Sequence, residues 1–213
     1  MKYEPLEYIY EPSGNPKART MLLLHGTGGD EKDLLSLASY FGSGFNILSL
    51  RGNVNENGMP RFFRRLAMGV FDEQDLEFRT CEMVEFIKKL SVKHQFDSAK
   101  IVALGYSNGA NIAGAVLTLS PDFLEGAILL RPMRPFKRKG PLPDRIATPV
   151  FISTGTYDPT IMAADTENYV KLLSDSGFEV THFDLDAGHN LTQDDIDLAT
   201  GWFKRLNSKI DFG

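Results

Sequence analysis

The stretch IVALGYSNGANIAGAVLTL at residues 101–119 decides the fold. A short apolar run ends at Gly105-Tyr106-Ser107-Asn108-Gly109, and a second apolar stretch rich in small residues follows it. This pattern predicts a strand, a tight turn and a buried helix. G-x-S-x-G at such a junction is the motif of a nucleophile elbow, in which a strained turn presents a serine hydroxyl above a sheet. The alternative is a glycine-rich turn whose serine only caps the helix.

Length and composition favour one globular domain over residues 1–213, because 42% of the residues are hydrophobic and 24% are charged. The net charge of −5 argues against nonspecific nucleic-acid binding. The single cysteine, Cys81, excludes an intramolecular disulfide and a site built from several cysteines. We find neither the apolar core of a signal peptide nor a run long enough to span a membrane, so we expect a cytoplasmic protein with no membrane partner.

Around this stretch, apolar runs alternate with helical patterns. Strands are predicted at 8–10, 21–24, 45–50, 126–130, 149–153 and 178–183, and helices at 31–41, 73–93, 161–175 and 193–206. Residues 51–70 are expected to be irregular. Asp72 is placed to cap one helix, and Thr192 with Asp195 resembles a capping box. The alternation predicts an α/β fold with a mainly parallel sheet, helices on both faces and ligands at the carboxyl ends of the strands.

A serine hydroxyl is a weak nucleophile, so the elbow needs a histidine base and a carboxylate. Four histidines compete for the role of base: His25, His94, His182 and His189. Only His189 lies in a small-residue loop between the last strand and the last helix, where it can reach the elbow. Its alternative is a surface or capping histidine. His25 follows a strand in a glycine-rich loop, and we expect it to hold that loop in place.

Asp158 is the favoured carboxylate because it follows the strand at 149–153 and is held between Gly155 and Pro159. Three other aspartates are poorer candidates, since one lies in a proline-rich loop, one in a predicted helix and one beside His189: Asp144, Asp165 and Asp186. The alternative for Asp158 is an ordinary turn or cap.

The order Ser107, Asp158, His189 along the chain is that of the α/β-hydrolase fold. In such a triad the histidine takes the serine proton and the carboxylate orients the imidazole. The oxyanion needs preorganised donors. One is expected to be the backbone N–H of Asn108, and the other the N–H of Thr27 in the glycine-rich loop.

With these residues placed, the chain resembles the small bacterial carboxylesterases of the phospholipase/carboxylesterase family. The likeness covers nearly the whole chain and is strongest to the hydroquinone- or catechol-linked hydrolase branch, which implies action on aromatic or short acyl esters. It rests on HGTGGDE at 25–31, RGNVNENGMPRFFRR at 51–65, GYSNGAN at 105–111, RPM at 131–133, GTYDP at 155–159 and Gly188-His189. The resemblance implies the same triad of Ser107, Asp158 and His189. The related dienelactone hydrolases generally use cysteine at the elbow, so Ser107 tells against that subfamily.

Residues 51–71 follow a strand and mix apolar side chains with arginines. The candidates for a substrate pocket are Arg51, Met59, Phe62 and Phe63, with an arginine reading an anionic group. The alternative is that the aromatic residues are core and the arginines form a solvated face.

The connection at 131–145 is basic: Arg131, Arg134, Lys137, Arg138, Lys139 and Arg145. We expect a solvated loop. Its alternative roles are to cover the site, to contact the partner in a homodimer or to attract acidic substrates.

These observations predict a carboxylic ester hydrolase that acts on small soluble esters through an acyl-enzyme at Ser107. No insertion is long enough for a large lid domain. The alternatives are an acyl-thioesterase or lysophospholipase, and a noncatalytic binding protein that has kept the fold. We expect a small-molecule ester as partner and no metal or organic cofactor, because a side chain activates the nucleophile.

Overall fold

A seven-stranded sheet forms the centre of the computed structural model, which describes residues 3–15, 17–137 and 147–210. The strand order is β1-β3-β2-β8-β9-β10-β11, and every neighbouring pair is parallel except β1 with β3. The strands are β1 (Tyr8–Glu11), β2 (Thr20–Leu24), β3 (Asn46–Leu50), β8 (Ile101–Tyr106), β9 (Gly126–Leu130), β10 (Pro149–Gly155) and β11 (Glu179–Leu185). The predicted mainly parallel sheet is confirmed.

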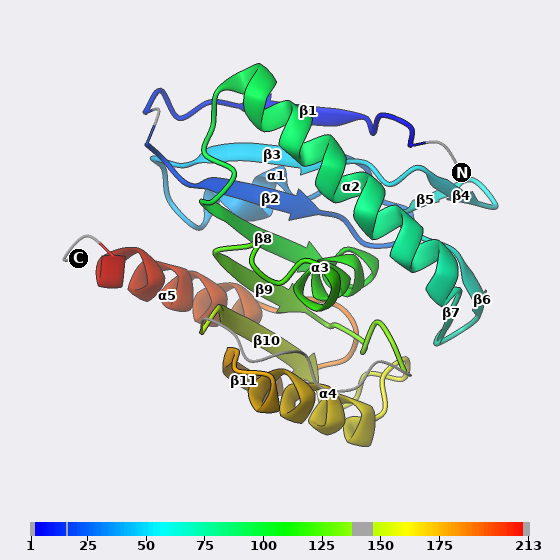
Figure 1. Ribbon diagram of the computed structural model, residues 1–213. Coiled ribbons are helices and arrows are strands. Elements are labelled where there is room, and N and C mark those ends of the chain that lie inside the picture. The colour runs from blue at the N-terminus through cyan, green and yellow to red at the C-terminus, as the bar shows by residue number, and fades with distance from the viewer. Residues whose placement is uncertain (1–2, 16, 138–146, 211–213) are drawn as a thin grey trace.

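Helices cover both faces of this sheet (Figure 1). One face carries α2 (Glu73–His94), α3 (Asn108–Leu119) and α4 (Ala163–Asp175), and the other carries α1 (Leu35–Ser39) and α5 (Gln193–Ile210). The core therefore lies in two apolar layers separated by the sheet.

Strand β2 shows why both layers can form. Leu22 and Leu24 pack into the layer under α2 and α3, whereas Met21 and Leu23 pack into the layer under α1 and α5. Successive side chains of a strand point to opposite faces, so a strand covered on both sides must be apolar throughout.

Local hydrogen bonds set the ends of two helices. The Asp72 carboxylate accepts from the Asp75 N–H at 3.1 Å and caps α2 as predicted. The helix expected at 31–41 is shorter, because α1 covers only Leu35–Ser39. The Asp30 carboxylate accepts from the Lys32 N–H at 2.8 Å and stabilises a turn before α1 instead of a helical start.

The segment at 51–70, expected to be irregular, instead forms two hairpins together with Phe71. They are β4 (Val54–Glu56) with β5 (Met59–Arg61), and β6 (Arg65–Ala67) with β7 (Val70–Phe71). Asn57 and Gly58 both have positive φ, which is the signature of a tight two-residue turn. Figure 1 shows both hairpins beyond the carboxyl ends of the central strands.

No helix in the described part of the chain is long and apolar enough to cross a membrane.

Candidate active site

Ser107 occupies a sharp turn between β8 and α3. Its φ is +51°, a value that residues other than glycine seldom adopt, and its N–H donates to the Leu130 carbonyl of β9 at 2.9 Å. Although Ser107 is at the N-cap position of α3, its side chain makes no capping hydrogen bond. The hydroxyl is therefore directed elsewhere, which disfavours the helix-capping interpretation.

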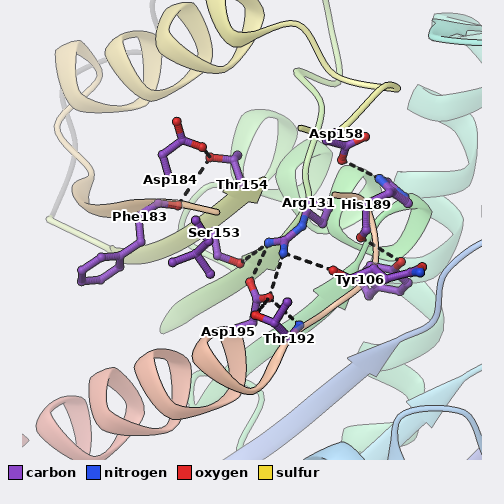
Figure 2. Close-up of polar contacts among 12 residues, drawn as sticks. Tyr106, Arg131, Ser153, Thr154, Asp158, Phe183, Asp184, His189, Thr192 and Asp195 are labelled. Carbon is purple, nitrogen blue, oxygen red and sulfur yellow. Dashed lines mark hydrogen bonds and ion pairs between the residues drawn. The ribbon is translucent and has the colours of Figure 1, made fainter. Parts of the chain in front are cut away.

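The three residues predicted as a triad meet at the carboxyl edge of the sheet. His189 Nε2 lies 2.9 Å from Ser107 Oγ, and His189 Nδ1 lies 2.6 Å from Asp158 Oδ2. Figure 2 shows Asp158 and His189 side by side, each on a loop that follows a strand. With the Nδ1 proton donated to Asp158, Nε2 is free to accept the Ser107 proton. The arrangement is thus competent to generate a serine nucleophile.

The surroundings of Asp158 favour its ionised form. Its side chain is nearly buried, and burial alone would raise the pKa of the carboxyl group. The Thr160 hydroxyl and N–H donate to Oδ1 at 2.6 and 2.8 Å, and His189 lies at Oδ2. Together these hydrogen bonds outweigh burial and hold the pKa of Asp158 below its ordinary value.

The other histidines make different contacts. The buried His25 accepts the Gly52 N–H at Nε2 over 3.1 Å and lies 2.6 Å from the Gly26 carbonyl through Nδ1. Burial lowers the pKa of His25, which favours the neutral form that can make both hydrogen bonds. His25 therefore holds its glycine-rich loop, as predicted. His94 contacts Tyr8 and His182 contacts Thr154, both away from the triad.

Thr27 and Asn108, the predicted oxyanion donors, both line the cavity at Ser107. The Asn108 side chain is buried and its Oδ1 accepts the Phe62 N–H at 2.8 Å, which fixes the first turn of α3. Within the described residues, the backbone N–H groups of Thr27 and Asn108 have no protein acceptor. Both groups are therefore available to a ligand.

The loop that carries His189 is held by Arg131, a residue that we expected in a solvated segment. That expectation is wrong, because Arg131 is fully buried and forms a two-pronged ion pair with Asp195 at 2.6 and 2.8 Å. Arg131 also donates to the carbonyls of Gly188 at 2.9 Å and Asn190 at 3.3 Å. The Arg131 guanidinium thus fixes the backbone on both sides of His189.

Tyr106 and Thr192 add hydrogen bonds to the network around the His189 loop. The Tyr106 hydroxyl donates to the His189 carbonyl at 3.1 Å, so three successive carbonyls of the loop are held. Asp195 accepts from the Thr192 N–H at 2.8 Å, which confirms the capping pattern predicted for α5. The sequence pattern identified Asp195 as a cap but contained no signal for its second partner, Arg131.

A cavity of about 260 Å³ opens over Ser107. Its walls come from the glycine-rich loop, the hairpins, the elbow and the two triad loops. The lining residues are Thr27, Arg61, Arg65, Met68, Gly69, Phe71, Tyr106, Ser107, Asn108, Asn111, Arg131, Met133, Thr160 and His189.

The four predicted pocket residues do not line this cavity. Phe62 and Phe63 are buried in the core against the helices, as the alternative interpretation held. Arg51 pairs with Glu31 and Glu7, and the half-exposed Met59 packs over Gly28.

The hairpin register explains this correction. β5 pairs Val54 with Arg61, and its last residue, Arg61, turns its side chain into the cavity rather than toward solvent. The prediction of a solvated loop at 131–145 is wrong for Arg131, which is buried. Arg138, Lys139 and Arg145 lie outside the described residues. In the described part of the chain, no group of three or more His, Cys, Asp or Glu side chains could hold a metal ion.

Comparison with known proteins places the chain in a family. The chain matches the dienelactone hydrolase family over residues 59–199, a range that contains Ser107, Asp158 and His189, and it belongs to this family of hydrolases. The argument that a serine at the elbow tells against dienelactone hydrolases is therefore wrong for the family as a whole. The identity of the elbow residue does not define membership.

Among individual proteins, the chain is 46% identical over 199 residues to the putative hydrolase MhqD of Bacillus subtilis (strain 168), covering 93% of this chain and 98% of that protein. It is 27% identical over 169 residues to acyl-protein thioesterase 1 of Candida albicans (strain SC5314 / ATCC MYA-2876), covering 73% and 72% of the two chains. The crystal structure of the Bacillus cereus carboxylesterase superposes with a TM-score of 0.91 at 44% identity over 94% of each chain. These matches confirm the resemblance to small carboxylesterases and the α/β-hydrolase fold without a large lid.

Proposed function

We propose that the protein is a carboxylesterase that hydrolyses small soluble esters through an acyl-enzyme at Ser107. The single observation that supports this most is the unbroken relay from Ser107 Oγ to His189 to Asp158, with contacts of 2.9 and 2.6 Å, at a strained turn. Membership of a hydrolase family and the carboxylesterase structure support the reaction class.

In the acylation step, His189 Nε2 takes the hydroxyl proton as Ser107 Oγ forms a bond to the ester carbonyl carbon. The imidazolium then gives this proton to the leaving alcohol as the ester C–O bond breaks. In the second step, water loses a proton to His189 and its oxygen forms a bond to the acyl carbon. The bond between this carbon and Ser107 Oγ then breaks, and the imidazolium returns its proton to Oγ, which releases the carboxylic acid and restores Ser107. Asp158 remains ionised and stabilises the imidazolium in both steps.

The backbone N–H groups of Thr27 and Asn108 would bind the oxyanion of each tetrahedral intermediate. Each such donor lowers the barrier by on the order of 3 kcal/mol. His25 supports this role by fixing the loop that carries Thr27.

The size of the cavity favours small substrates. A volume of about 260 Å³ lies just below the range of pockets for drug-sized ligands. Short acyl or aryl esters fit this space, whereas long acyl chains would have to extend out of it.

A second candidate is a thioesterase, because the Candida albicans relative carries that name and the same machinery cleaves both ester types. A lysophospholipase would need room for a long acyl chain. The intact relay weighs against a noncatalytic binding protein.

The test is hydrolysis of p-nitrophenyl esters from acetate to decanoate, alongside an acyl thioester, by the wild type and by Ser107→Ala. We expect a Ser107-dependent rate that is highest for short chains. Faster cleavage of the thioester would favour the second candidate. Equal rates for the wild type and Ser107→Ala would reject the proposed function.

A further inference from the structure

Two asparagines at the start of α3, Asn108 and Asn111, each hold a neighbouring loop through the side-chain oxygen. Asn108 Oδ1 accepts the Phe62 N–H at 2.8 Å, and Asn111 Oδ1 accepts the Met133 N–H at 2.7 Å. Of the two ends of an asparagine amide, only the oxygen accepts a hydrogen bond. These contacts therefore fix the orientation of both amides and direct each NH2 group away from the loop that its oxygen holds.

The two NH2 groups differ in their access to a ligand. Asn108 Nδ2 is enclosed by protein and has no hydrogen-bond partner. Asn111 Nδ2 also has no partner in the part of the chain that the structure describes, yet it is not one of the enclosed atoms. The Asn111 residue is only 5% exposed and lines the cavity over Ser107. A ligand in this cavity is therefore the group that Asn111 Nδ2 can reach.

The place of Asn111 in α3 relates it to the reaction centre. Its backbone N–H donates to the Ser107 carbonyl at 2.9 Å, so the two residues lie one helical turn apart on the same face of α3. One turn is about 5.4 Å along the helix axis. Since the scissile carbonyl group lies at Ser107 Oγ and at the N–H groups of Thr27 and Asn108, Asn111 Nδ2 is placed for atoms next to the ester group rather than for the ester carbonyl itself.

The chemistry of the donor sets the class of acceptor. An amide NH2 group is neutral, so it binds an ether, hydroxyl or carbonyl oxygen without requiring a charge on the ligand. In the free protein water can occupy this position, and a substrate oxygen would replace that water. A methylene group at the same place would displace the water and leave the largely buried donor unpaired, which is costly.

We propose that Asn111 Nδ2 determines substrate specificity by donating a hydrogen bond to a second, neutral oxygen of the ester substrate. The proposal rests on the esterase function above and names its preferred class of substrates, which are esters with an ether, hydroxyl or carbonyl oxygen close to the scissile group. This oxygen belongs either to the acyl part or to the alcohol part, and the substrates of the test distinguish the two.

Three matched pairs of substrates test the proposal. For the acyl part the pairs are phenyl methoxyacetate with phenyl butyrate, and phenyl 3-methoxypropanoate with phenyl pentanoate. For the alcohol part the pair is 2-methoxyethyl acetate with butyl acetate. The members of each pair differ only by an ether oxygen in place of a methylene group. The readout is the ratio of kcat/KM for the ether to that for its methylene analogue, compared between the wild type and a variant so that the intrinsic reactivity of the esters cancels.

Asn111→Asp separates the two halves of the amide. An aspartate keeps an oxygen for the Met133 N–H but replaces the NH2 group by an ionised oxygen, which cannot donate. We expect this variant to lower the ratio by about three- to tenfold for at least one pair. Asn111→Ala, which removes both hydrogen bonds, should lower the same ratio. A fall in Asn111→Ala without a fall in Asn111→Asp would assign the specificity to the Met133 contact. That result, or an unchanged ratio for all three pairs in Asn111→Asp, would overturn the proposal.

Asn168→Asp is the matched control. Asn168 belongs to α4, is exposed and does not line the cavity over Ser107. The substitution adds the same negative charge, so it reports any general effect of charge on the ratio. Its ratio should equal that of the wild type. Equal falls in Asn168→Asp and Asn111→Asp would mean that charge alone sets the ratio, and would contradict the proposal. Melting temperatures identify any variant that is not folded.

A spectroscopic measurement keeps this proposal separate from the esterase function. Ser107→Ala cannot form the acyl-enzyme, so NMR spectra of the isotope-labelled variant follow the Asn111 side-chain NH2 resonances while each ester is titrated. A larger shift of these resonances with the ether than with its methylene analogue supports the donor even if no ester of the set is turned over, and equal shifts reject it. Conversely, Ser107-dependent turnover with ratios that Asn111→Asp leaves unchanged would reject the donor and leave the esterase.

Discussion

At the scale of single residues, Ser107 has an energetically unfavourable backbone conformation at the position of the proposed nucleophile. A residue other than glycine at φ +51° costs on the order of 1–3 kcal/mol. We therefore predict that Ser107→Gly has a higher free energy of unfolding than Ser107→Ala by about 1 kcal/mol, although both lack activity. Urea unfolding of the two variants measures this difference. A more stable alanine variant would show that the turn is not strained.

The depressed pKa of Asp158 makes stability depend on pH. In the unfolded chain an aspartate protonates near pH 3.9, whereas in the folded protein Asp158 stays ionised at lower pH. The unfolded state then binds more protons, so the contribution of Asp158 is complete above about pH 4 and is lost as the pH falls through the folded-state pKa.

Asp158→Asn should consequently be less stable than the wild type at pH 7, and the difference should shrink below about pH 4. Urea unfolding of both proteins at pH 7 and pH 3 provides the measurement. A constant difference at the two pH values would argue against an ionised, hydrogen-bonded Asp158.

Sequence reasoning located the residues of the relay better than those of the pocket. Ser107, Asp158 and His189 follow strand ends, and parallel strands bring their carboxyl ends to one edge, so their meeting was predictable. The stretch at 51–71 was predicted to supply a pocket wall with an arginine, but Arg51 was singled out rather than Arg61 and Arg65, which line the cavity. Whether a side chain in a hairpin faces a cavity or the core depends on strand register, which composition does not reveal.

At the scale of elements, the loop between β11 and α5 must hold His189 within hydrogen-bonding distance of Ser107. Arg131 does this with one planar group that bonds Asp195 and the carbonyls of Gly188 and Asn190. A lysine keeps the charge but cannot make this set of hydrogen bonds.

Arg131→Lys should therefore lower kcat by about 10- to 100-fold, because small displacements of a catalytic group are costly, and change KM little. Steady-state kinetics on the folded fraction, established by near-UV circular dichroism, checks this. Wild-type kcat in a folded Arg131→Lys protein would contradict the positioning role.

The close approach of α3 to the end of β2 depends on Gly109. A Cβ at this position would overlap the Leu24 carbonyl, which belongs to the sheet and cannot move aside. Gly109→Ala should destabilise the protein by about 1–3 kcal/mol or more, as expected for overpacking.

The control is Gly201→Ala, the same change within α5. A Cβ at this position meets only the Arg205 side chain at 3.6 Å, so the change should stabilise the protein by about 0.5–1 kcal/mol. Thermal unfolding of both variants compares the two, and the same sign for both would contradict this packing.

Element boundaries were predictable where periodicity and capping agree. For α2 the apolar stripe and the Asp72 cap both appear in the sequence, and the helix covers Glu73–His94. The hairpins at 51–71 were missed although Asn57-Gly58 is a strong turn signal, because their strands of two or three residues are too short to show a period.

At the scale of the whole molecule, the alternation of strands and helices was enough to predict a mainly parallel sheet covered on both faces. The order of the strands fixes which loops share an edge. That edge carries the triad and the cavity, and both hairpins lie beyond it, as Figure 1 shows for the hairpins. The buried Arg131–Asp195 pair could not be predicted, because its members are 64 positions apart and belong to different elements.

Covalent labelling with a fluorophosphonate, mapped by peptide mass spectrometry, tests the central claim most directly. The account predicts one adduct on Ser107 of the wild type, none on Ser107→Ala, and labelling slowed by about a hundredfold or more in His189→Ala. An unlabelled wild type, an adduct on another residue, or wild-type labelling of His189→Ala would contradict a serine activated by His189.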